Sequence, residues 1–571
     1  MDRQRTVWPF ALLLAATLAP MVASAQDHQG HMMHHDMGAS DSLVWWMPPM
    51  DPGMPMMPGL DNALPPVTPF LAGQNMDASL YPEAVPREVV PLADGDTLNL
   101  EATLVRRTIN GKTFVMYGYN GQYPGPLIQV DQGSTIAVHF TNNIEMPTTV
   151  HWHGLRLDNR FDGLPNITQA PVERGETFTY EVFFRDTGIY WYHPHMREDI
   201  QQDLGLYGNM LVDPPDTDYY SPVNREEVVI LDDILIDHNG MIPWGAEAPT
   251  HALMGRFGTV MLTNGMTDYR LAVQRGEVVR FFLTNVANAR TFNVTFGGAP
   301  IKVVASDVSK YEHEVWVGSV PIAPAERYVV EVRFDKPGEV AITNSIQAIN
   351  HFRGEFYPHV DTLGMVTVAD VAAEPDYTAP FEQLRDNEDV QRDIDAYRPY
   401  FDKPVDKELV LGVRVQNLPL PIVMSMEIDT LYVPPMEWND AMPMMNWLST
   451  GTQVTWILRE RDTGLENMDV HWDFKTGDVV KIRVFNDPKS FHPMNHPIHV
   501  HGQRFLVVEM DGVPNPNLVW KDTAIVPVGS TMEILVDMSN PGDWMLHCHS
   551  AEHLHAGMML SFSVEAEDAS R

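Results

Sequence analysis

The stretch GDWMLHCH, residues 542–549, runs from a glycine through an apolar segment to two histidines that flank a cysteine. The stretch GIYWYHPH, residues 188–195, has the same spacing of five residues from the glycine to the first histidine. A third copy begins at Gly338 and reaches Thr343, Asn344 and Ser345, where no histidine or cysteine remains. The sequence therefore predicts three homologous units, of which only the outer two keep histidines in this segment.

Two further patterns repeat along the chain. The motif HWHG at 151–154 recurs as HVHG at 499–502 and is replaced by VTFG at 294–297. Glycine turns between alternating apolar residues, at 130–138, 273–281 and 474–482, predict antiparallel hairpins. Short strands with glycine and proline turns are typical of β-sandwiches or barrels, so the expected fold class is all-β. We place the units at 87–215, 216–370 and 405–566, with an acidic connector containing some helix at 371–404.

The histidine motifs predict a metal enzyme. A single H-x-H pair on a strand means little, because alternate strand residues share one face. Here four histidine motifs occur together, and a histidine flanks each side of Cys548, the only cysteine among 571 residues. A thiolate, two imidazoles and a thioether are the soft ligand set of a blue-copper site. Eight further histidines remain in H-x-H pairs, too many for one ion, which favours a copper enzyme with several metal ions.

In order and spacing, these motifs are similar to the four copper signatures of the multicopper oxidase family, which includes laccases and bacterial cuprous oxidases. The resemblance covers roughly residues 87–566. It implies three cupredoxin-like β-sandwich domains, of which the middle one has no copper ligands. It also implies four copper ions as cofactors, namely one type 1, one type 2 and two type 3 ions.

The resemblance also assigns ligands to each copper ion. The type 1 ion is expected to bind His496, Cys548, His553 and the axial Met558. The type 2 ion is expected to bind His151 and His499. One type 3 ion is expected to bind His153, His193 and His549, and the other His195, His501 and His547. In the first unit Pro194 stands in the place of Cys548, so that unit cannot build a blue site.

The resemblance further implies the course of the reaction. Substrates give one electron at a time, whereas dioxygen needs four to become water, and four coppers store them. Cys548, with its neighbours His547 and His549, provides a bonded path between the type 1 site and the oxygen site. Asp162 matches an acid of the family that relays protons, although an aspartate before Gly163 also suits a simple turn. The second acid of some bacterial members is here Leu554, which puts a second proton route in doubt.

The motifs leave three functions open: oxidation of phenols, oxidation of Cu(I), and copper storage without turnover. The complete set of ten histidine ligands argues against storage. Met494 stands two residues before His496, where cuprous oxidases place a methionine of their substrate site, and His492 stands where they have an acid. A second methionine-rich stretch contains Met436, Met442, Met444 and Met445. Irregular core packing explains these methionines about equally well.

The amino-terminal end predicts export. Residues 1–25 combine Arg3 and Arg5 with an apolar run and small residues before Gln26, which is typical of a secretory signal peptide. The protein is therefore expected in the periplasm or outside the cell. Residues 26–86 are rich in methionine, histidine and proline, which predicts a flexible segment whose thioethers would suit Cu(I). No membrane span is expected, because no second apolar stretch of about 18 residues follows.

The charge balance restricts the partners. A net charge of −38, from 76 acidic and 38 basic residues, argues against nucleic-acid binding, which needs a basic surface. A single cysteine cannot form an intrachain disulfide, so large apolar cores must stabilise the units. The expected partners are dioxygen and a small phenolic or aromatic donor or Cu(I). The sequence leaves the oligomeric state open.

Overall fold

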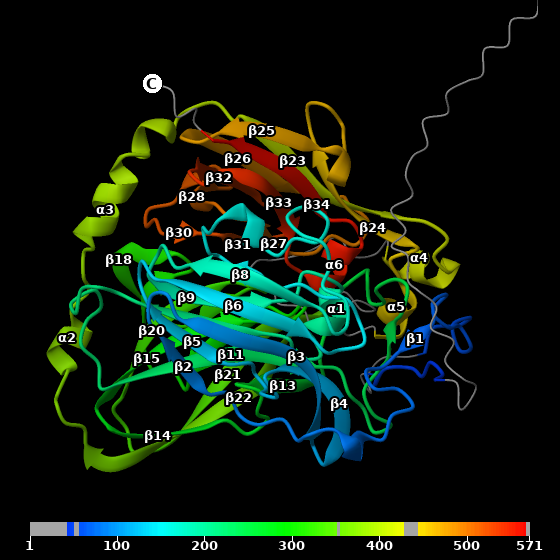
Figure 1. Ribbon diagram of the computed structural model, residues 1–571, viewed down its shortest axis with the longest axis horizontal. Helices are drawn as coiled ribbons and strands as arrows, with labels where there is room; N and C mark the ends of the chain where they lie inside the picture. Colours follow the sequence, from blue (N-terminus) through cyan, green and yellow to red (C-terminus); the bar gives the residue numbers. More distant parts are fainter. Residues whose placement is uncertain (1–42, 51–55, 351–354, 427–442, 567–571) are drawn as a thin grey trace, which may run out of the picture. The chain divides into compact units, whose positions relative to one another are not determined.

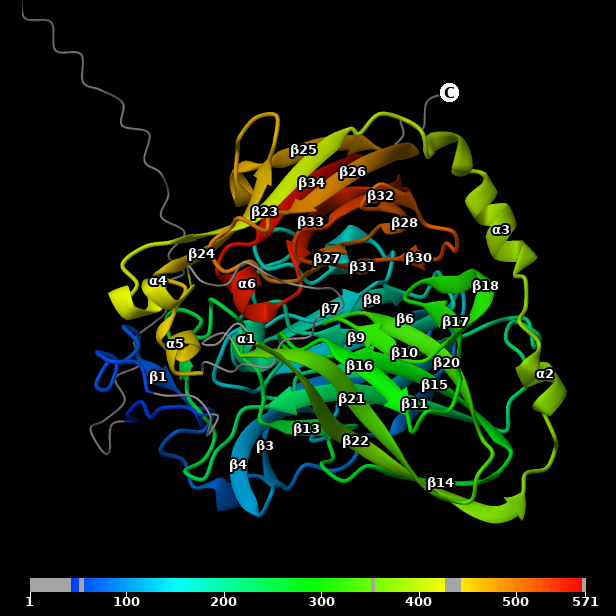
Figure 2. The same ribbon diagram turned by 180° about the vertical axis from the view of Figure 1, so that it is seen from behind.

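The computed structural model describes residues 43–50, 56–350, 355–426 and 443–566. Within these residues the strands form three pairs of facing sheets and one two-stranded ribbon. The fold is all-β, with cupredoxin-like sandwiches, as the sequence predicts (Figures 1 and 2). The predicted signal peptide lies outside the described residues. In the part of the chain that the structure describes, helices long and apolar enough to cross a membrane are absent.

The first sandwich contains the strands from β2 to β10. Its five-stranded sheet has the order β2 (Val89–Leu92), β5 (Leu127–Asp131), β10 (Gly208–Asp213), β9 (Gly188–His193) and β7 (His151–His153). Its four-stranded sheet has the order β4 (Lys112–Tyr119), β3 (Thr97–Ile109), β6 (Thr135–Asn142) and β8 (Thr177–Phe183). The histidine strands β7 and β9 are therefore neighbours at one edge of the five-stranded sheet.

The second sandwich contains the strands from β11 to β22, except β12. Its six-stranded sheet has the order β13 (Val260–Thr263), β11 (Arg225–Ile234), β15 (Glu277–Asn285), β20 (Arg327–Phe334), β17 (Ile301–Ser306) and β18 (Ser309–Val317). Its five-stranded sheet has the order β14 (Arg270–Arg275), β22 (Glu355–Ala372), β21 (Gly338–Asn350), β16 (Phe292–Phe296) and β19 (Val320–Ile322).

The third sandwich contains the strands from β23 to β34. One sheet has the order β24 (Val454–Glu460), β23 (Lys407–Val415), β26 (Asp478–Asn486), β32 (Thr531–Met538), β28 (Arg504–Met510) and β29 (Val513–Pro514), with β30 (Trp520–Lys521) also on β28. The facing sheet has the order β25 (His471–Lys475), β34 (Met559–Glu565), β33 (Gly542–Cys548), β27 (His496–Val500) and β31 (Thr523–Val526).

Each sandwich encloses its own apolar core. Along β3 and β25 buried and exposed residues alternate, because successive side chains of a strand point to opposite faces. The buried faces meet in three large clusters, which contain Trp152, Phe281 and Trp472 respectively. Removing these apolar side chains from water is the main favourable contribution to folding.

The three glycine turns have a different role from the predicted one. Gly133, Gly276 and Gly477 have φ values of +89°, +83° and +92°, as expected for tight turns. However, the strands on either side of each turn belong to different sheets, for example β5 and β6 in the first sandwich. The prediction of antiparallel hairpins is therefore wrong, and each turn carries the chain from one sheet to the facing one. A hairpin and a turn between facing sheets have the same sequence pattern, in which alternating apolar residues flank a glycine.

The repeated motifs occupy equivalent strand pairs. His151 pairs with His193 between β7 and β9, and His499 pairs with His547 between β27 and β33. In the second sandwich Val294 pairs with Asn344 and Thr295 with Thr343, between β16 and β21. The same pair of neighbouring antiparallel strands therefore occurs three times, and the middle copy carries apolar and hydroxyl residues in place of histidines.

The amino-terminal segment corrects a second prediction. Residues 26–86 are predicted to be flexible, but residues 43–50 and 56–86 pack on the folded body. The Trp45 ring lies 5.7 Å from that of Trp447, and its Nε1 donates to the carbonyl of Val67 at 2.9 Å. Met57 and Leu60 are buried in the apolar cluster of the third sandwich. These side chains pack on an apolar surface formed by residues distant in sequence, which the local sequence pattern does not indicate.

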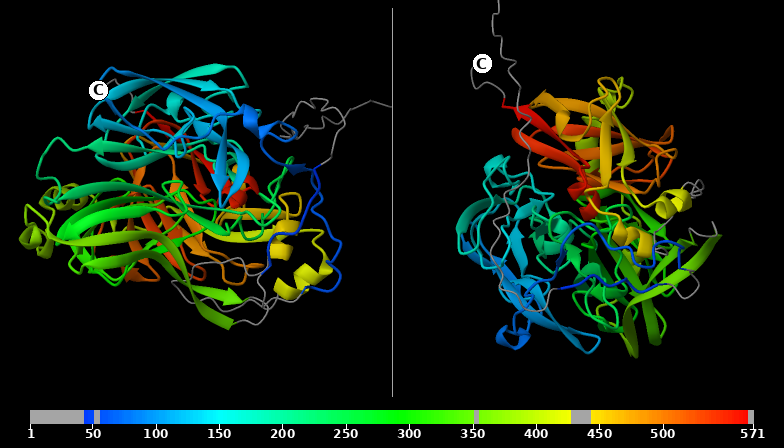
Figure 3. Two further views of the ribbon diagram at one scale, coloured as in Figure 1. Left: turned by 90° about the horizontal axis from the view of Figure 1, so that it is seen from below. Right: turned by 90° about the vertical axis from the view of Figure 1, so that its right-hand side faces the viewer.

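The same segment contains one strand of a short ribbon. Strand β1 (Pro69–Phe70) pairs with β12 (Trp244–Gly245), and the side chain of Glu247 accepts a hydrogen bond from the backbone of Thr68 at 2.8 Å. The segment runs on the side of the molecule that also carries α4 (Leu420–Met426) and α5 (Pro443–Leu448) (Figure 3). The segment thus contacts both the third sandwich and the stretch of chain between β11 and β13.

The predicted connector contains α2 (Thr378–Glu382) and α3 (Glu388–Asp395), along the outer side of the molecule (Figure 1). Val390 and Ile394 of α3 join a small apolar cluster with Leu506 and Trp520 of the third sandwich. The two remaining helices, α1 (Glu198–Gln201) and α6 (Ala551–His555), follow the histidine strands β9 and β33 and contact each other. The first and third sandwiches therefore meet where their histidines lie.

Candidate metal centre

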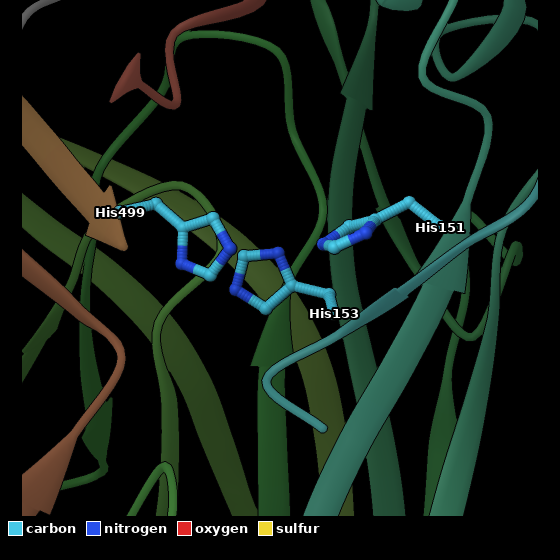
Figure 4. A group of neighbouring side chains, drawn as sticks. All are labelled: His151, His153 and His499. Atoms are coloured by element: carbon cyan, nitrogen blue, oxygen red, sulfur yellow. The ribbon is translucent and has the colours of Figure 1, made fainter. Parts of the chain in front are cut away.

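Eight histidines from the two outer sandwiches converge on one buried site. Four come from β7, β9 and the turn after β9: His151, His153, His193 and His195. Four come from β27, β33 and the residues that follow them: His499, His501, His547 and His549. All eight are buried. The rings of His153 and His499, from different sandwiches, are stacked with their centroids 3.8 Å apart (Figure 4).

The nitrogen atoms of these histidines form three groups in which every ligand atom lies within 4.8 Å of the others. One group contains His153, His193 and His549, and a second contains His195, His501 and His547. These are the two sets that the sequence resemblance implies for the type 3 ions. The third group contains His151, His153 and His499, and so includes the two histidines expected at the type 2 ion. Every group combines residues of both outer sandwiches.

The donor atoms are those that a metal site needs. Six of the eight rings leave one buried nitrogen without a hydrogen-bond partner: Nε2 of His151, His193, His195, His499 and His549, and Nδ1 of His153. The remaining two rings place their Nε2 atoms 2.9 Å apart, between His501 and His547. A buried polar atom without a partner is costly, which favours a bound cation at this position. Burial lowers the pKa of His195, His547 and His549 to about 3, so these rings are neutral donors at neutral pH.

A second, separate group lies inside the third sandwich. The Sγ atom of Cys548 lies 3.4 Å from Nδ1 of His496 and 3.8 Å from Nδ1 of His553. Met558 is buried beside them, and its backbone bonds to those of Cys548 and His553. Burial raises the pKa of Cys548 to about 12, so that a bound cation, rather than water, must displace the thiol proton.

Strand geometry explains why the two groups are separate but adjacent. Successive residues of a strand point to opposite faces, so Cys548 faces away from His547 at the end of β33. Cys548 therefore points into the core of the third sandwich, whereas His547 and His549 point to the first sandwich. The two groups are joined through the covalent chain His547-Cys548-His549.

Asp162, the residue for which the family resemblance implies a proton relay, lies beside the histidine site. Its carboxylate is fully buried, and Oδ2 accepts a hydrogen bond from Nδ1 of His501 at 2.9 Å. Oδ1 lies 3.4 Å from Nδ1 of His151, which donates to the Asp162 carbonyl at 2.7 Å. Asp162 thus contacts a histidine of each outer sandwich. It also caps the short helical turn Asn159–Phe161, so the turn and the contact with the site coexist.

The sequence does not reveal four further residues that contact the two groups. Glu198 lies 3.1 Å from Nδ1 of His195 and also binds His555. Asp522 and Thr523 both contact His153 and His499 of the histidine site. At the cysteine group, the ring of Trp456 lies 4.1 Å from that of His553 and 4.9 Å from that of His496. Glu198 follows His195 by three residues, a spacing that was available as a signal. Asp522 is 369 residues from His153, and local sequence carries no sign of this contact.

The residues predicted on the donor side lie close to the cysteine group. Met494 is 3% exposed and belongs to the same apolar cluster as Cys548 and Met558, together with Met444 and Met445 of α5. His492 is buried and lies near enough to His553 to contribute to the lowering of its pKa, which burial causes first. Met436 and Met442 lie outside the described residues.

Comparisons with known proteins establish the family. Family models described as multicopper oxidase match residues 101–217, 218–360 and 439–568, which together make up more than half of the chain. The chain belongs to the multicopper oxidase family. It is accordingly a copper-dependent oxidoreductase, and its partners are dioxygen and an electron donor. The histidine groups with their unpartnered nitrogens fit copper as the metal.

Several curated proteins are similar to this multicopper oxidase over most of their length. Laccase-1 of Botryotinia fuckeliana is 26% identical over 481 residues, covering 79% of this chain and 78% of the relative. Dihydrogeodin oxidase of Aspergillus terreus is 24% identical over 522 residues, covering 82% and 83%. A multicopper oxidase of Mycobacterium tuberculosis is 26% identical over 502 residues, covering 81% and 86%.

Solved structures share the fold of this multicopper oxidase. A multicopper oxidase of Campylobacter jejuni, described as a metallo-oxidase, has a TM-score of 0.63 at 22% identity and covers 88% of this chain and 99% of its own. A multicopper oxidase of the hyperthermophile Aquifex aeolicus has a TM-score of 0.63 at 22% identity, with 85% and 100% covered. At these identities the similarity concerns the fold alone.

Proposed function

We propose that this protein is a laccase-like multicopper oxidase that couples four one-electron oxidations of a small donor to the reduction of dioxygen to water. One observation carries the proposal: two buried groups of ligands are joined by the three consecutive residues His547, Cys548 and His549. A storage protein would have no use for such a bonded connection between two separate sites.

The proposed ligands are those that the family resemblance implies, and the proximity of their donor atoms supports them. His496, Cys548, His553 and Met558 would hold the type 1 ion, and His151 and His499 would hold the type 2 ion. His153, His193 and His549 hold one type 3 ion, and His195, His501 and His547 hold the other. Copper, when bound, supplies the one-electron redox chemistry that no amino-acid side chain of the site provides.

The protein's own residues position the ligands and handle protons. The backbone carbonyls of Asp162, Pro194 and Asp522 hold the Nδ1 atoms of His151, His193 and His499, which leaves each Nε2 free to bind metal. The buried carboxylate of Asp162 is the proposed proton relay, because it lies between histidines of both outer sandwiches.

The predicted leader at residues 1–25 supports export to the periplasm or beyond.

Replacing Cys548 tests the copper assignment. The variant Cys548→Ser should lose the intense visible absorption of the thiolate–copper bond and all oxidase activity, while three copper ions remain bound. Metal analysis and absorption spectra of the wild type and variant measure this. A wild-type preparation that is active with one copper ion per chain would refute the three-ion site.

Cu(I) is a second candidate donor, and burial of the electron-entry side favours it. His496 is only 1% exposed. Methionines from three separate segments belong to the buried apolar cluster that also contains Cys548: Met57, then Met444 and Met445 of α5, and Met494. A bulky phenol would need this cover to open before it could approach His496. A cuprous ion is small, and thioethers select Cu(I).

The variant Met494→Leu distinguishes the two donors. Leucine keeps the volume and removes only the sulfur, so the loss of packing should stay below about 1.5 kcal/mol. If Met494 binds the incoming Cu(I), turnover with Cu(I) should fall at least about tenfold more than turnover with a phenol, both measured on the copper-loaded enzyme. Met532→Leu, in the same apolar cluster but on β32, is the matched control. Equal losses with both donors would favour the phenol oxidase and leave Met494 as a packing residue.

A further inference from the structure

None of the described residues of the second sandwich belongs to the histidine and cysteine groups, yet one of its side chains bonds to Asp522 beside the histidine site. Arg327, at the start of β20, is fully buried and forms two parallel hydrogen bonds with Asp522. Its Nη1 donates to Oδ1 at 2.7 Å, and its Nη2 donates to Oδ2 at 2.5 Å. Asp522 lies between β30 and β31 of the third sandwich. Such bidentate, charge-assisted pairs fix geometry as well as charge.

Asp522 in turn contacts a histidine of the first sandwich. Nε2 of His153 donates to Oδ1 of Asp522 at 3.1 Å and also lies 3.1 Å from the hydroxyl of Thr523. The Thr523 hydroxyl donates to the same carboxylate oxygen at 2.9 Å. Residues of all three sandwiches therefore meet around one carboxylate.

These hydrogen bonds determine which nitrogen of the His153 ring is left without a partner. His153 is the histidine among the eight whose unpartnered buried nitrogen is Nδ1. In His151, His193 and His499 a backbone carbonyl binds Nδ1, and Nε2 is free. The hydrogen bond on one ring nitrogen determines which nitrogen is available to a metal. Asp522 therefore selects the opposite nitrogen in His153.

The surrounding chain keeps this ion pair in place. Nε of Arg327 donates to the carbonyl of Ile189 at 3.1 Å, in the strand that ends at His193. Gly154, directly after His153, has a φ of +86°. A Cβ atom there would lie 2.5 Å from Oδ2 of Asp522 and 2.6 Å from Nη2 of Arg327. Only glycine allows the ion pair to approach the histidine strand this closely.

We propose that the Arg327–Asp522 ion pair is a positioning device for His153, through which the ligand-free second sandwich orients a ligand of the type 3 copper pair. The pair touches neither the reacting atoms nor, by the proposed assignment, the metal ions. It acts by holding the His153 ring so that Nδ1 faces His193 and His549. This inference rests on the proposed function of the histidine site.

The test uses a double variant, Arg327→Met with Asp522→Leu. Removing both partners leaves no unpaired buried charge, so the protein should fold, whereas removing one partner alone is strongly destabilising. His153 then loses the hydrogen bond that orients it. Copper content and the electron paramagnetic resonance (EPR) spectrum are measured on the copper-loaded full chain. Two coupled Cu(II) ions are silent in that spectrum, and separate ions are visible.

In the wild type half of the bound copper should be visible by EPR, and in the double variant nearly all of it, with the blue colour unchanged. The control, Arg290→Met with Asp233→Leu, removes a buried pair joined at 2.6 Å. Within the described residues, neither partner forms a hydrogen bond or an ion pair with the eight histidines. It should keep the wild-type ratio. A double variant with the wild-type ratio would show that Arg327 and Asp522 only join the sandwiches.

A milder variant covers the case in which the double variant does not fold. Arg327→Lys keeps the buried charge but replaces two parallel hydrogen bonds by a point charge. It should raise the visible fraction of copper in the same direction, by less than the double variant. An unchanged ratio in Arg327→Lys contradicts the inference. A wild type without any silent copper would instead contradict the three-ion site itself, so the two failures are distinguishable.

Discussion

Asp162 illustrates how one residue serves two purposes. As a turn residue it closes the short helical turn after Asp158, and its backbone carbonyl fixes the Nδ1 atom of His151. As a buried carboxylate it accepts from His501, a histidine of the other outer sandwich. Reduction of dioxygen to water consumes protons, and a carboxylate sealed from solvent beside the histidines is suited to deliver them.

The variant Asp162→Asn separates these purposes. The amide keeps an oxygen that can accept from His501, so the copper ligands and the blue colour should be retained. It no longer carries an exchangeable acid proton, so reoxidation of the reduced enzyme by dioxygen should slow by about 100-fold or more. Stopped-flow absorption measures both the reoxidation and the anaerobic reduction, and the latter should change little.

A nearby carboxylate provides the control for this prediction. Asp158 lies four residues earlier, is partly exposed, and bonds to Arg160 rather than to any of the eight histidines. Asp158→Asn should therefore reoxidise at the wild-type rate. If Asp162→Asn also reoxidises at that rate, Asp162 has only its structural function in the turn.

At the scale of elements, the strand pair that carries the histidines forms whether or not histidines are present. The pairs β7–β9, β16–β21 and β27–β33 have the same antiparallel arrangement in the three sandwiches. In the middle pair Val294 and Thr343 occupy the positions of histidines in the outer pairs. Backbone hydrogen bonds and apolar packing form the pair in every case, so replacement of the ligands does not disturb the fold.

The amino-terminal segment shows the opposite case, in which tertiary contacts decide an element. Its proline-rich composition gives no periodic pattern, and residues 43–50 and 56–86 contain only one short strand and one helical turn. It is nevertheless held in place by the contacts of Trp45, Met57 and Leu60 with the third sandwich. Burial of large apolar side chains can order a chain that has no regular secondary structure.

At the scale of the whole molecule, the histidine site joins the first sandwich to the third. Four histidines come from the first sandwich and four from the third. The apolar contacts between these sandwiches, around Leu164, Met545 and Leu554, form a small cluster. By the proposed assignment, metal ions bound by histidines of both sandwiches would add to this interface. Ligands that bind only the folded state stabilise it by mass action, by about 4 kcal/mol when the free ligand is at 1,000 times its Kd.

Removal of copper should consequently lower the unfolding temperature, and its return should restore it. Calorimetry of the chelated and reloaded protein measures this. Cys548→Ser is the informative comparison, because it removes the ion that lies within a single sandwich. It should keep most of the stabilisation, since by the proposed assignment the three remaining ions bridge two sandwiches. Equal unfolding temperatures with and without copper would contradict a site shared between the sandwiches.

Much of the site follows from the sequence itself. Histidines at alternate positions of a strand share a face, and a cysteine between two histidines faces the other way, so His547, Cys548 and His549 already define two adjacent groups. The glycine spacing before Thr343, His193 and His547 identifies three copies of one unit. These are local properties, determined by the period of a strand and the side chains on it, and therefore readable along the chain.

Other features depend on the tertiary structure. Whether a glycine turn joins paired strands or crosses between sheets depends on which strands pair, and Gly133 crosses. The contact between Asp522 and His153 joins residues 369 positions apart, and Arg327 of the second sandwich bonds to Asp522 and to the carbonyl of Ile189. The reason is that a hydrogen bond or an ion pair depends on distance in space. Only the packing of the three sandwiches brings these residues together.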